Sequence, residues 1–431
     1  MSREMKDSGV EWIGEIPEDW DVKRIKHAVV QMGSGTTPNS DNSNFYDGNI
    51  AWIQSGDLYN TPIITKTSKT VTEQAIQRCS ALKIYHKPYI VIAMYGASVG
   101  NVSIASIDAC TNQACCIIKP NDNNDIDYLK YWLEVCKTDF IRKSVGGGQP
   151  NISQDKVREQ TYLCPSPTDQ QQIVHFLDRK CTAIDTAIEK TKKSIEKLEK
   201  YKKAVITKAV TKGIDPNAKM KDSGVEWIGE IPEDWDVKKL RTYFSRRINK
   251  NTHLHENNLL SLSYGRIIRK NIDTKEGLLP ESFDGYNIVE DGDIVIRGTD
   301  LQNDHRSLRT GLVTERGIIT SAYMTLRPKE DVNSTYYHYL LHCYDISKVF
   351  YSMGGGLRQS LDYWEFIRMP VLHPTDREQE KIVSYIKTKC TAIDNAIEKK
   401  KKAIEKWEEY KKSLIYYAVT GKIDCRNEVI E

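Results

Sequence analysis

The segment His338-Tyr-Leu-Leu-His342 has the i, i+4 spacing with which two histidines on one helix face can bind zinc. It lacks the glutamate that acts as general base in the corresponding protease motif, and its aromatic and leucine neighbours indicate a packed helix. His253-Leu-His255 stands in a polar stretch, where solvated side chains are expected. We therefore predict no metal site in this chain.

Other reactive motifs are weak or missing. The sequence has no G-x-x-x-x-G-K-[S/T] loop for nucleotide hydrolysis and no Cys-x-x-Cys pair, and Gly33-Ser-Gly35 is a lone G-x-G. The ten cysteines follow no disulfide-framework spacing, which predicts a reduced cytoplasmic setting. We expect no secretion signal and no membrane span, because no apolar stretch is long enough. Nothing in the sequence points to a catalytic triad or to a pair of catalytic carboxylates.

The frame that holds these residues is duplicated. The sequence MKDSGVEWIGEIPEDWDVK occurs without change at residues 5–23 and 220–238. An eleven-residue block at 180–190 returns at 389–399 with ten identities, whereas the residues between the blocks look unrelated. A tandem duplication with constant frames and divergent inserts suits a molecule that holds two different readers in one fixed geometry.

The later blocks predict two long amphipathic helices. Apolar residues recur there in steps of 4 and 7, on one helix face, and each has an apolar counterpart 209 residues later. Each helix should be about 40–45 residues long, or roughly 60–65 Å. A dimerisation arm and a pair formed within one chain both fit, and the two matching stripes favour the second. The positions are Ile173, Leu177, Ile184, Ile188, Ile195, Leu198, Val205 and Ile206, with Ile382, Ile386, Ile393, Ile397, Ile404, Trp407, Leu414 and Ile415.

Signals at the helix ends and charges on their surfaces complete this prediction. Proline with Thr-Asp precedes each helix, and Gly213 and Gly421 are expected to end them. Residues 190–212 contain nine lysines and two glutamates, and residues 399–422 contain eight lysines and three glutamates. A solvated helix face and a stripe that faces phosphates or a partner both remain open.

The inserts share a mixed α/β outline. Expected strands are 89–94, 99–105 and 114–118 in the first insert, and 259–263, 293–296 and 317–326 in the second. Each insert then has one helix, 126–145 or 335–353, that stops at a triple glycine, and a strand that ends in Pro165 or Pro374 follows. The two inserts should therefore share a fold although their residues differ.

These ordered motifs resemble the specificity subunits of type I restriction–modification enzymes over essentially the whole length. The resemblance rests on Trp12-Ile-Gly-Glu-Ile-Pro-Glu-Asp-Trp20 and its repeat, and on a set of short motifs in fixed order. They are Gly33-Ser-Gly-Thr-Thr-Pro38, Trp52-Ile-Gln-Ser-Gly-Asp57, Tyr95-Gly-Ala-Ser-Val-Gly100, Gly146-Gly-Gly-Gln-Pro-Asn-Ile-Ser153, Asp169-Gln-Gln-Gln-Ile-Val174 and Ala418-Val-Thr-Gly-Lys-Ile-Asp424.

The resemblance implies an α+β fold with pseudo-twofold internal duplication. Two α/β target recognition domains, 1–165 and 214–373, would be joined by long antiparallel coiled-coil helices in 166–213 and 374–431. Each domain would read one half of a split asymmetric site in double-stranded DNA. The chain would have no catalysis and no cofactor of its own. Two methyltransferase subunits would bind S-adenosylmethionine, and restriction subunits would use ATP and Mg²⁺.

Candidate DNA-reading residues follow from this resemblance, because Arg can read guanine and Asn or Gln can read adenine. A phosphate contact or a loop-stabilising role stays open for each of them. The first insert offers Gly33, Ser34, Gly35, Thr36, Thr37, Ser40, Gln54, Ser55, Tyr95, Ser98, Asn112, Gln113, Gln149 and Asn151. The second offers Ser263, Tyr264, Arg266, Arg297, Thr299, Gln302, Asn303, Arg306, Arg309, Tyr323, Arg358 and Gln359.

Two other functions were weighed. A coiled-coil scaffold that binds only protein fits the helices but leaves the polar, Arg/Gln/Asn-rich inserts unexplained, and salt-dependent DNA binding separates the two hypotheses. A single-chain enzyme that joins recognition to methylation or cleavage would need a pocket for S-adenosylmethionine in the isolated chain. Both explain the duplicated frame poorly.

The identity of the 19-residue repeats exceeds what packing requires, and we hypothesise recent duplication or continuing recombination between the copies. The fold should need only the anchors Trp12, Ile16 and Trp20 and their counterparts Trp227, Ile231 and Trp235. Polar changes such as Lys6→Gln or Asp222→Asn should therefore change the free energy of unfolding by less than about 0.5 kcal/mol and leave methylation intact. Loss of modification in either variant would instead indicate that a protein interface maintains the repeat.

Overall fold

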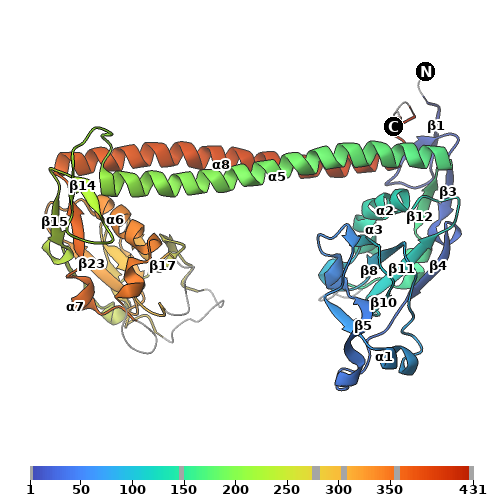
Figure 1. Cartoon of the computed structure of the whole chain (residues 1–431), viewed down its shortest axis with the longest axis horizontal. Coiled ribbons are helices and arrows are strands. Elements are labelled where there is room, and N and C mark those ends of the chain that lie inside the picture. The colour runs from blue at the N-terminus through green and yellow to red at the C-terminus, as the bar shows by residue number, and fades with distance from the viewer. Residues whose placement is uncertain (1–2, 145–149, 274–281, 302–307, 354–359, 427–431) are drawn as a thin grey trace. The chain divides into compact units, whose positions relative to one another are not determined.

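The computed structural model describes residues 3–144, 150–273, 282–301, 308–353 and 360–426 (Figure 1). The chain forms two compact units: unit 1 comprises residues 1–191 with 402–431, and unit 2 comprises residues 192–401. Two long helices, α5 (Pro167–Lys212) and α8 (Asp376–Val419), each contribute one end to each unit. The domain boundaries given above place the helices in segments of their own, and they stay a prediction.

Unit 1 places short strands and helices before the start of α5. Its strands are β1 (Met5–Asp7), β2 (Glu15–Pro17), β3 (Asp21–Arg24), β4 (Val29–Ser34), β5 (Tyr46–Ile53), β6 (Ile63–Ile64), β7 (Lys69–Val71), β8 (Tyr89–Ala93), β9 (Val102–Ala105), β10 (Ala109–Thr111), β11 (Cys115–Pro120) and β12 (Thr161–Cys164). Its helices are α1 (Glu73–Arg78), α2 (Ile126–Val135), α3 (Lys137–Lys143) and α4 (Gln154–Arg158).

The main sheet of unit 1 has the order β4-β11-β8-β9-β6, and a second sheet has the order β10-β5-β7. Strand β8 is buried along its whole length because its run of apolar residues lies between two paired strands. Helix α2 covers this sheet and buries Leu129, Trp132 and Leu133 in the core, together with Ile184 and Ile188 of α5. The core thus joins the insert to the long helices.

Unit 2 repeats this construction with different residues. Its strands are β13 (Met220–Asp222), β14 (Glu230–Pro232), β15 (Asp236–Lys239), β16 (Phe244–Arg246), β17 (Leu260–Ser263), β18 (Arg266–Arg269), β19 (Asn287–Val289), β20 (Ile294–Ile296), β21 (Thr310–Leu312), β22 (Gly317–Ile319), β23 (Met324–Pro328) and β24 (Pro370–His373), and its helices are α6 (Ser334–Ile346) and α7 (Tyr363–Phe366). The main sheet has the order β16-β23-β20-β21, which matches β4-β11-β8-β9 of unit 1 strand for strand. The shared outline predicted for the inserts is therefore confirmed.

The long helices pack against each other within each unit. In unit 1 the apolar stripe of α5 meets Leu414 and Ile415 near the end of α8, and Lys411 Nζ lies 2.6 Å from an Asp185 carboxylate oxygen. In unit 2 the end of α5 packs on the start of α8, and Lys202 Nζ lies 2.6 Å from Asp394. The two ion pairs join residues that correspond across the duplication, so α5 and α8 are antiparallel.

A hydrogen-bonded tryptophan docks each long helix on the repeated frame. The Trp20 Nε1–H group donates to Asp169 Oδ2 at 3.2 Å, and the Trp235 Nε1–H group donates to Glu378 Oε2 at 2.9 Å. Asp169 and Glu378 are corresponding residues in the first turns of α5 and α8. Both indole rings are buried.

The same tryptophans also contact the end of the other long helix. Gly421 has φ +72° and ends α8, and a side chain there would collide with Pro17 and approach Trp20. Gly213 has φ +74° and ends α5 beside Pro232 and Trp235. The left-handed conformation favours glycine at both sites, and at Gly421 the close approach of Pro17 also excludes a Cβ atom. We call each set of Trp, acidic residue and Gly a helix joint.

Several expectations need correction. Trp407, expected on the buried stripe, is 40% exposed, and Trp227 is 48% exposed although its repeat partner Trp12 is half-buried. The Trp227 ring packs edge-on against Tyr344 of α6, with ring centroids 6.5 Å apart. The strand expected at 317–326 is two strands, β22 and β23, separated by a turn.

The helix predicted in each insert is also interrupted. The first breaks at Cys136 between α2 and α3, and in the second α6 ends at Ile346 before a short 3-10 helix at Val349–Ser352. Lys348 between them has φ +63°, which no α-helix accommodates. The triple glycines expected to stop these helices lie outside the described residues.

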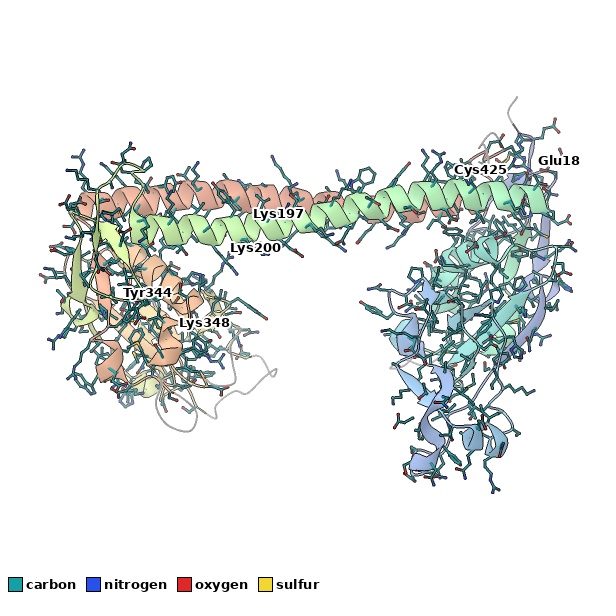
Figure 2. The ribbon with its side chains drawn as sticks, viewed as in Figure 1. Glu18, Lys197, Lys200, Tyr344, Lys348 and Cys425 are labelled. Carbon is teal, nitrogen blue, oxygen red and sulfur yellow. The ribbon has the colours of Figure 1, made fainter. Side chains whose placement is uncertain are left out.

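The lysine-rich faces are exposed to solvent, as Lys197 and Lys200 of α5 illustrate (Figure 2). Within the ranges that the structure describes, no helix has both the length and the apolar character needed to cross a membrane.

The helix joint of unit 2 can be tested by the substitution Trp235→Phe. The variant keeps one aromatic ring but removes the N–H donor and the second ring of the indole. The Glu378 carboxylate loses its partner and a cavity opens, so the free energy of unfolding should fall by about 2–4 kcal/mol at neutral pH. Trp227→Phe, at the exposed position of the same repeat, is the matched control and should cost less than about 0.5 kcal/mol.

This loss should depend on pH. Burial raises the pKa of Glu378, and the hydrogen bond from Trp235 opposes that rise. Without the donor the pKa in the folded state rises further, so the loss is largest above this pKa and shrinks as pH falls below the usual carboxyl range, where both states are protonated. Thermal unfolding at neutral and acidic pH measures it, and an equal loss at both pH values contradicts the proposed hydrogen bond.

Candidate nucleic-acid interface

The candidate residues of unit 1 converge on one edge of its sheets. Strands β4, β5, β8 and β10 end at this edge and β11 begins there, because Ser34 pairs with Cys116 and Ala93 pairs with Cys115. The described candidates of this insert lie at the ends of these strands, in the adjoining loops or, for Asn151, in the segment before α4 that pairs with Tyr95. The strand order thus gathers residues that are far apart in the sequence, and we call this set of loops the unit 1 edge.

Hydrogen bonds between the loops hold the unit 1 edge together. The Gly35 N–H group donates to Thr111 Oγ1 at 2.9 Å, and the Thr37 hydroxyl donates to Gln113 Oε1 at 2.7 Å. Tyr95 pairs with Asn151 in an isolated bridge. The loops therefore form one connected surface and not separate tails.

Individual candidates differ in accessibility. Thr37, Ser40, Tyr95, Gln113 and Asn151 are exposed. The half-buried positions are Gly33, Ser34, Thr36, Gln54, Ser55, Ser98 and Asn112, and Gly35 is buried. The hydroxyl of Ser98 donates to the Tyr95 carbonyl at 2.8 Å, and the Asn112 side chain accepts from the Ala114 N–H group, so both also stabilise turns.

Unit 2 has the equivalent edge. Strands β16 and β20 end there, and β21 and β23 begin there, because Ile296 pairs with both Thr310 and Met324. The candidates Arg297, Thr299 and Tyr323 lie in these loops. We call this set of loops the unit 2 edge.

The other described candidates of unit 2 lie on the β17–β18 hairpin. Tyr264 occupies its turn with φ +47° and is 87% exposed, and Ser263 and Arg266 flank the turn. The hairpin borders a groove of about 700 Å³ that is also lined by Lys202, Lys203 and other residues of unit 2. The turn of the hairpin also lies against Leu308 of the β20–β21 loop, so these candidates adjoin the unit 2 edge.

Arg309 does not fit the direct role predicted for it. Its side chain has no exposed surface, and its guanidinium donates to the carbonyls of Arg297, Thr299 and Asp300 at 3.2, 2.8 and 3.1 Å. Its backbone N–H group donates to Asp345. As the buried side chain cannot contact DNA, we interpret Arg309 as the residue that positions the loop after β20.

Some candidates cannot be placed. Gln149, Gln302, Asn303, Arg306, Arg358 and Gln359 lie outside the described residues.

Sequence reasoning missed two residues at the unit 2 edge. Arg246 ends β16, and Trp364 of α7 is 65% exposed. They line a pocket of about 240 Å³ together with Thr299 and Tyr323. The available signal was a tryptophan two residues after Asp362. The exposure of its side chain could not be read from the sequence.

The histidine pair lies in a packed helix, as predicted. His338 and His342 of α6 have ring centroids 6.1 Å apart, and the neighbouring Leu340 and Leu341 are buried. Burial lowers the pKa of His338 to about 4, so the ring is neutral at physiological pH. Among the described residues no group of three or more His, Cys, Asp or Glu side chains is arranged to hold a metal ion.

Comparison with known proteins adds independent information. Residues 17–200 match the family described as the type I restriction modification DNA specificity domain. The putative MjaX and the MjaVIII type I restriction enzyme specificity subunits of Methanocaldococcus jannaschii are 26% and 25% identical to this chain, and each alignment covers at least 95% of both proteins. Residues 17–200 thus match the DNA specificity domain of this family, and the chain as a whole is similar to type I restriction enzyme specificity subunits.

Other relatives of this family align less completely or only in fold. The MjaIX specificity subunit of the same organism is 33% identical over 235 residues, which are 53% of this chain and about half of that protein. A chain from a solved type I restriction–modification system has a TM-score of 0.70 at 11% identity and covers 95% of this chain. The HsdS subunit from Thermoanaerobacter tengcongensis has a TM-score of 0.53 at 12% identity, over 95% of this chain and 98% of its own. These two likenesses concern the fold.

The structural role of Arg309 predicts a clear effect on stability. Arg309→Lys keeps the charge but cannot donate to three carbonyls in a fork, so the free energy of unfolding should fall by about 2–4 kcal/mol. Arg266→Lys on the exposed hairpin is the control and should change it by less than about 0.5 kcal/mol. Chemical denaturation measures both variants, and equal stability of the two would contradict the buried role.

Proposed function

We propose that this chain recognises a bipartite, asymmetric site in double-stranded DNA, with each unit reading one half. The observation that carries the proposal is the combination of equivalent joints with unlike edges. The helix joints and the antiparallel ion pairs use corresponding residues in the two units, whereas the unit 1 and unit 2 edges carry different polar residues. A constant frame with two different surfaces is what two unlike half-sites require.

The accessible members of the two edges are the proposed base and phosphate contacts. Tyr95, Gln113 and Asn151 represent unit 1, and the exposed Thr299 with the half-buried Arg297 represents unit 2. Arginine and amide side chains can distinguish base pairs in the major groove, whereas contacts with phosphates fix register without sequence information. The exposed Tyr264 and Arg266 on the hairpin are proposed as further contacts of unit 2.

The antiparallel helices are proposed to act as a spacer that sets the gap between the half-sites. Two readers one turn of DNA apart, roughly 34–36 Å, meet the same groove face. A helix of 46 residues spans roughly 69 Å, so α5 and α8 are long enough to separate two readers by that distance or more.

In the proposed division of labour the chain performs no catalytic step. Two methyltransferase subunits bind S-adenosylmethionine and methylate adenine, and restriction subunits use ATP and Mg²⁺. The assembly acts on DNA in the cytoplasm. The specificity subunit supplies the sequence information and the geometry in which its partners act.

Exchange of one insert tests the proposal. Replacement of residues 24–165 by the same segment of a relative should change one half-site only, since each insert is bracketed by constant frame and carries its own edge. Mapping of methylated adenines in cells that express the exchanged chain reads out both half-sites and the gap. A change in both half-sites would contradict the separate reading by the two units.

A matched change to the spacer is the complementary variant. Insertion of four residues after both Thr191 and Lys400, which correspond across the duplication, lengthens each helix by roughly 6 Å, or about two base pairs. The gap should change while both half-sites stay as they were. An unchanged gap in a folded, active complex would exclude the spacer role.

A further inference from the structure

The pocket at the unit 2 edge is lined partly by residues that the sequence did not predict to read DNA. Its volume is about 240 Å³, and its lining includes Arg246, Thr299, Tyr323 and Trp364. The Trp364 indole is 65% exposed, whereas Trp20, Trp52, Trp132 and Trp235 are almost completely buried. Such an exposed aromatic ring beside a cationic side chain is typical of contact with nucleic-acid bases.

Hydrogen bonds hold the backbone that carries Trp364 at this pocket. The Asp362 carboxylate accepts from the N–H groups of Trp364 and Glu365 at 2.7 and 3.1 Å, which caps α7 and fixes the start of the helix. The Leu361 N–H group donates to the Gly298 carbonyl at 2.7 Å and ties this segment to the loop after β20. Trp364 is therefore presented from a held backbone.

Arg246 completes the pocket on its other side. It ends β16, and its guanidinium carbon lies 5.2 Å from the centroid of the Tyr363 ring. Tyr363 in turn packs edge-on against Trp364, with ring centroids 5.1 Å apart. Lys250, four residues after Arg246 in the chain, is also exposed. The surface is thus aromatic with cationic neighbours, which complements bases and phosphates.

The corresponding segment of unit 1, around α4, carries different residues. Ser153 caps α4 there, and Ile152 N–H donates to the Met94 carbonyl at 2.9 Å, in the same construction. The residue at the position of Trp364 is Asp155. A partner protein that binds twice, once to each unit, would need the same surface twice. A residue present in only one unit suits one half-site of an asymmetric DNA.

We propose that the pocket formed by Arg246, Tyr323 and Trp364 binds one nucleotide of the half-site read by unit 2. The Trp364 indole packs against the edge of a base in the groove, where a thymine methyl group offers apolar surface, and Arg246 donates to the neighbouring phosphate. This inference rests on the proposed function and names the contact through which unit 2 holds its half-site.

The experiment uses the full chain assembled with its methyltransferase subunits and a duplex that carries the site mapped by adenine methylation. The half-site of unit 2 is the one that stays unchanged when residues 24–165 are exchanged. Trp364→Ala should weaken binding roughly 10- to 100-fold, the range of one lost contact with a base edge. Trp364→Phe keeps a ring and should recover most of the affinity. Trp227→Ala removes another half-exposed indole of unit 2, away from the pocket, and should bind within about twofold of the parent, the ordinary scatter of surface changes.

A mutant cycle assigns the contact to its half-site. Scrambling the unit 2 half-site should abolish most of the difference between the parent and Trp364→Ala, because both changes remove the same interaction, whereas scrambling the other half-site should leave it. Arg246→Gln should also reduce the salt dependence of binding by about one phosphate contact.

Three results would overturn the inference: affinity of Trp364→Ala within twofold of the parent, additive losses in the cycle, or dissociation of the methyltransferase subunits from Trp364→Ala without DNA. The last would assign Trp364 to a protein interface. Failure of the proposed function can be distinguished from these results. In that case the exchange of residues 24–165 would alter no half-site, without any substitution at Trp364.

Discussion

The donation of a hydrogen bond from a buried indole to a carboxylate at the start of a long helix underlies the architecture of both units. Trp20 binds Asp169 and Trp235 binds Glu378, and each ring also packs beside the glycine that ends the other long helix. One side chain thereby connects the beginning of one helix, the end of the other and the frame from which an insert begins. Loss of this donor would leave a carboxylate without its partner and loosen all three elements.

Because the joints fix the frame, the inserts can differ without disturbing it. The two main sheets share their strand order, and α4 and α7 are capped by corresponding residues, Ser153 and Asp362. The residues of the two inserts differ throughout, and the second position of the capped helix holds Asp155 in α4 and Trp364 in α7. Stability thus resides in the parts that repeat, and recognition is assigned to the parts that do not.

The sequence predicted those features that depend on periodicity or on strong local signals. The 4 and 7 spacing located α5 and α8, and Gly213 and Gly421 marked their ends. Short strands such as β22 and β23 were merged, because three to five residues give too little alternation to reveal a turn between them. The direction of individual side chains could not be predicted from the sequence. Arg309 looks like a reader in the sequence, yet it is buried, and its guanidinium donates to three carbonyls at the start of its own β20–β21 connection. Trp364 was missed because its exposure depends on α7.

The account depends on two independent readers held at a fixed separation. Genome-wide mapping of methylated adenines in a host that carries the unaltered chain and its partners tests this directly, because it reports every specified base at once. The account predicts two short, unlike specified sequences separated by a gap of constant length and free composition. A single continuous recognition sequence, or two identical halves, would contradict it.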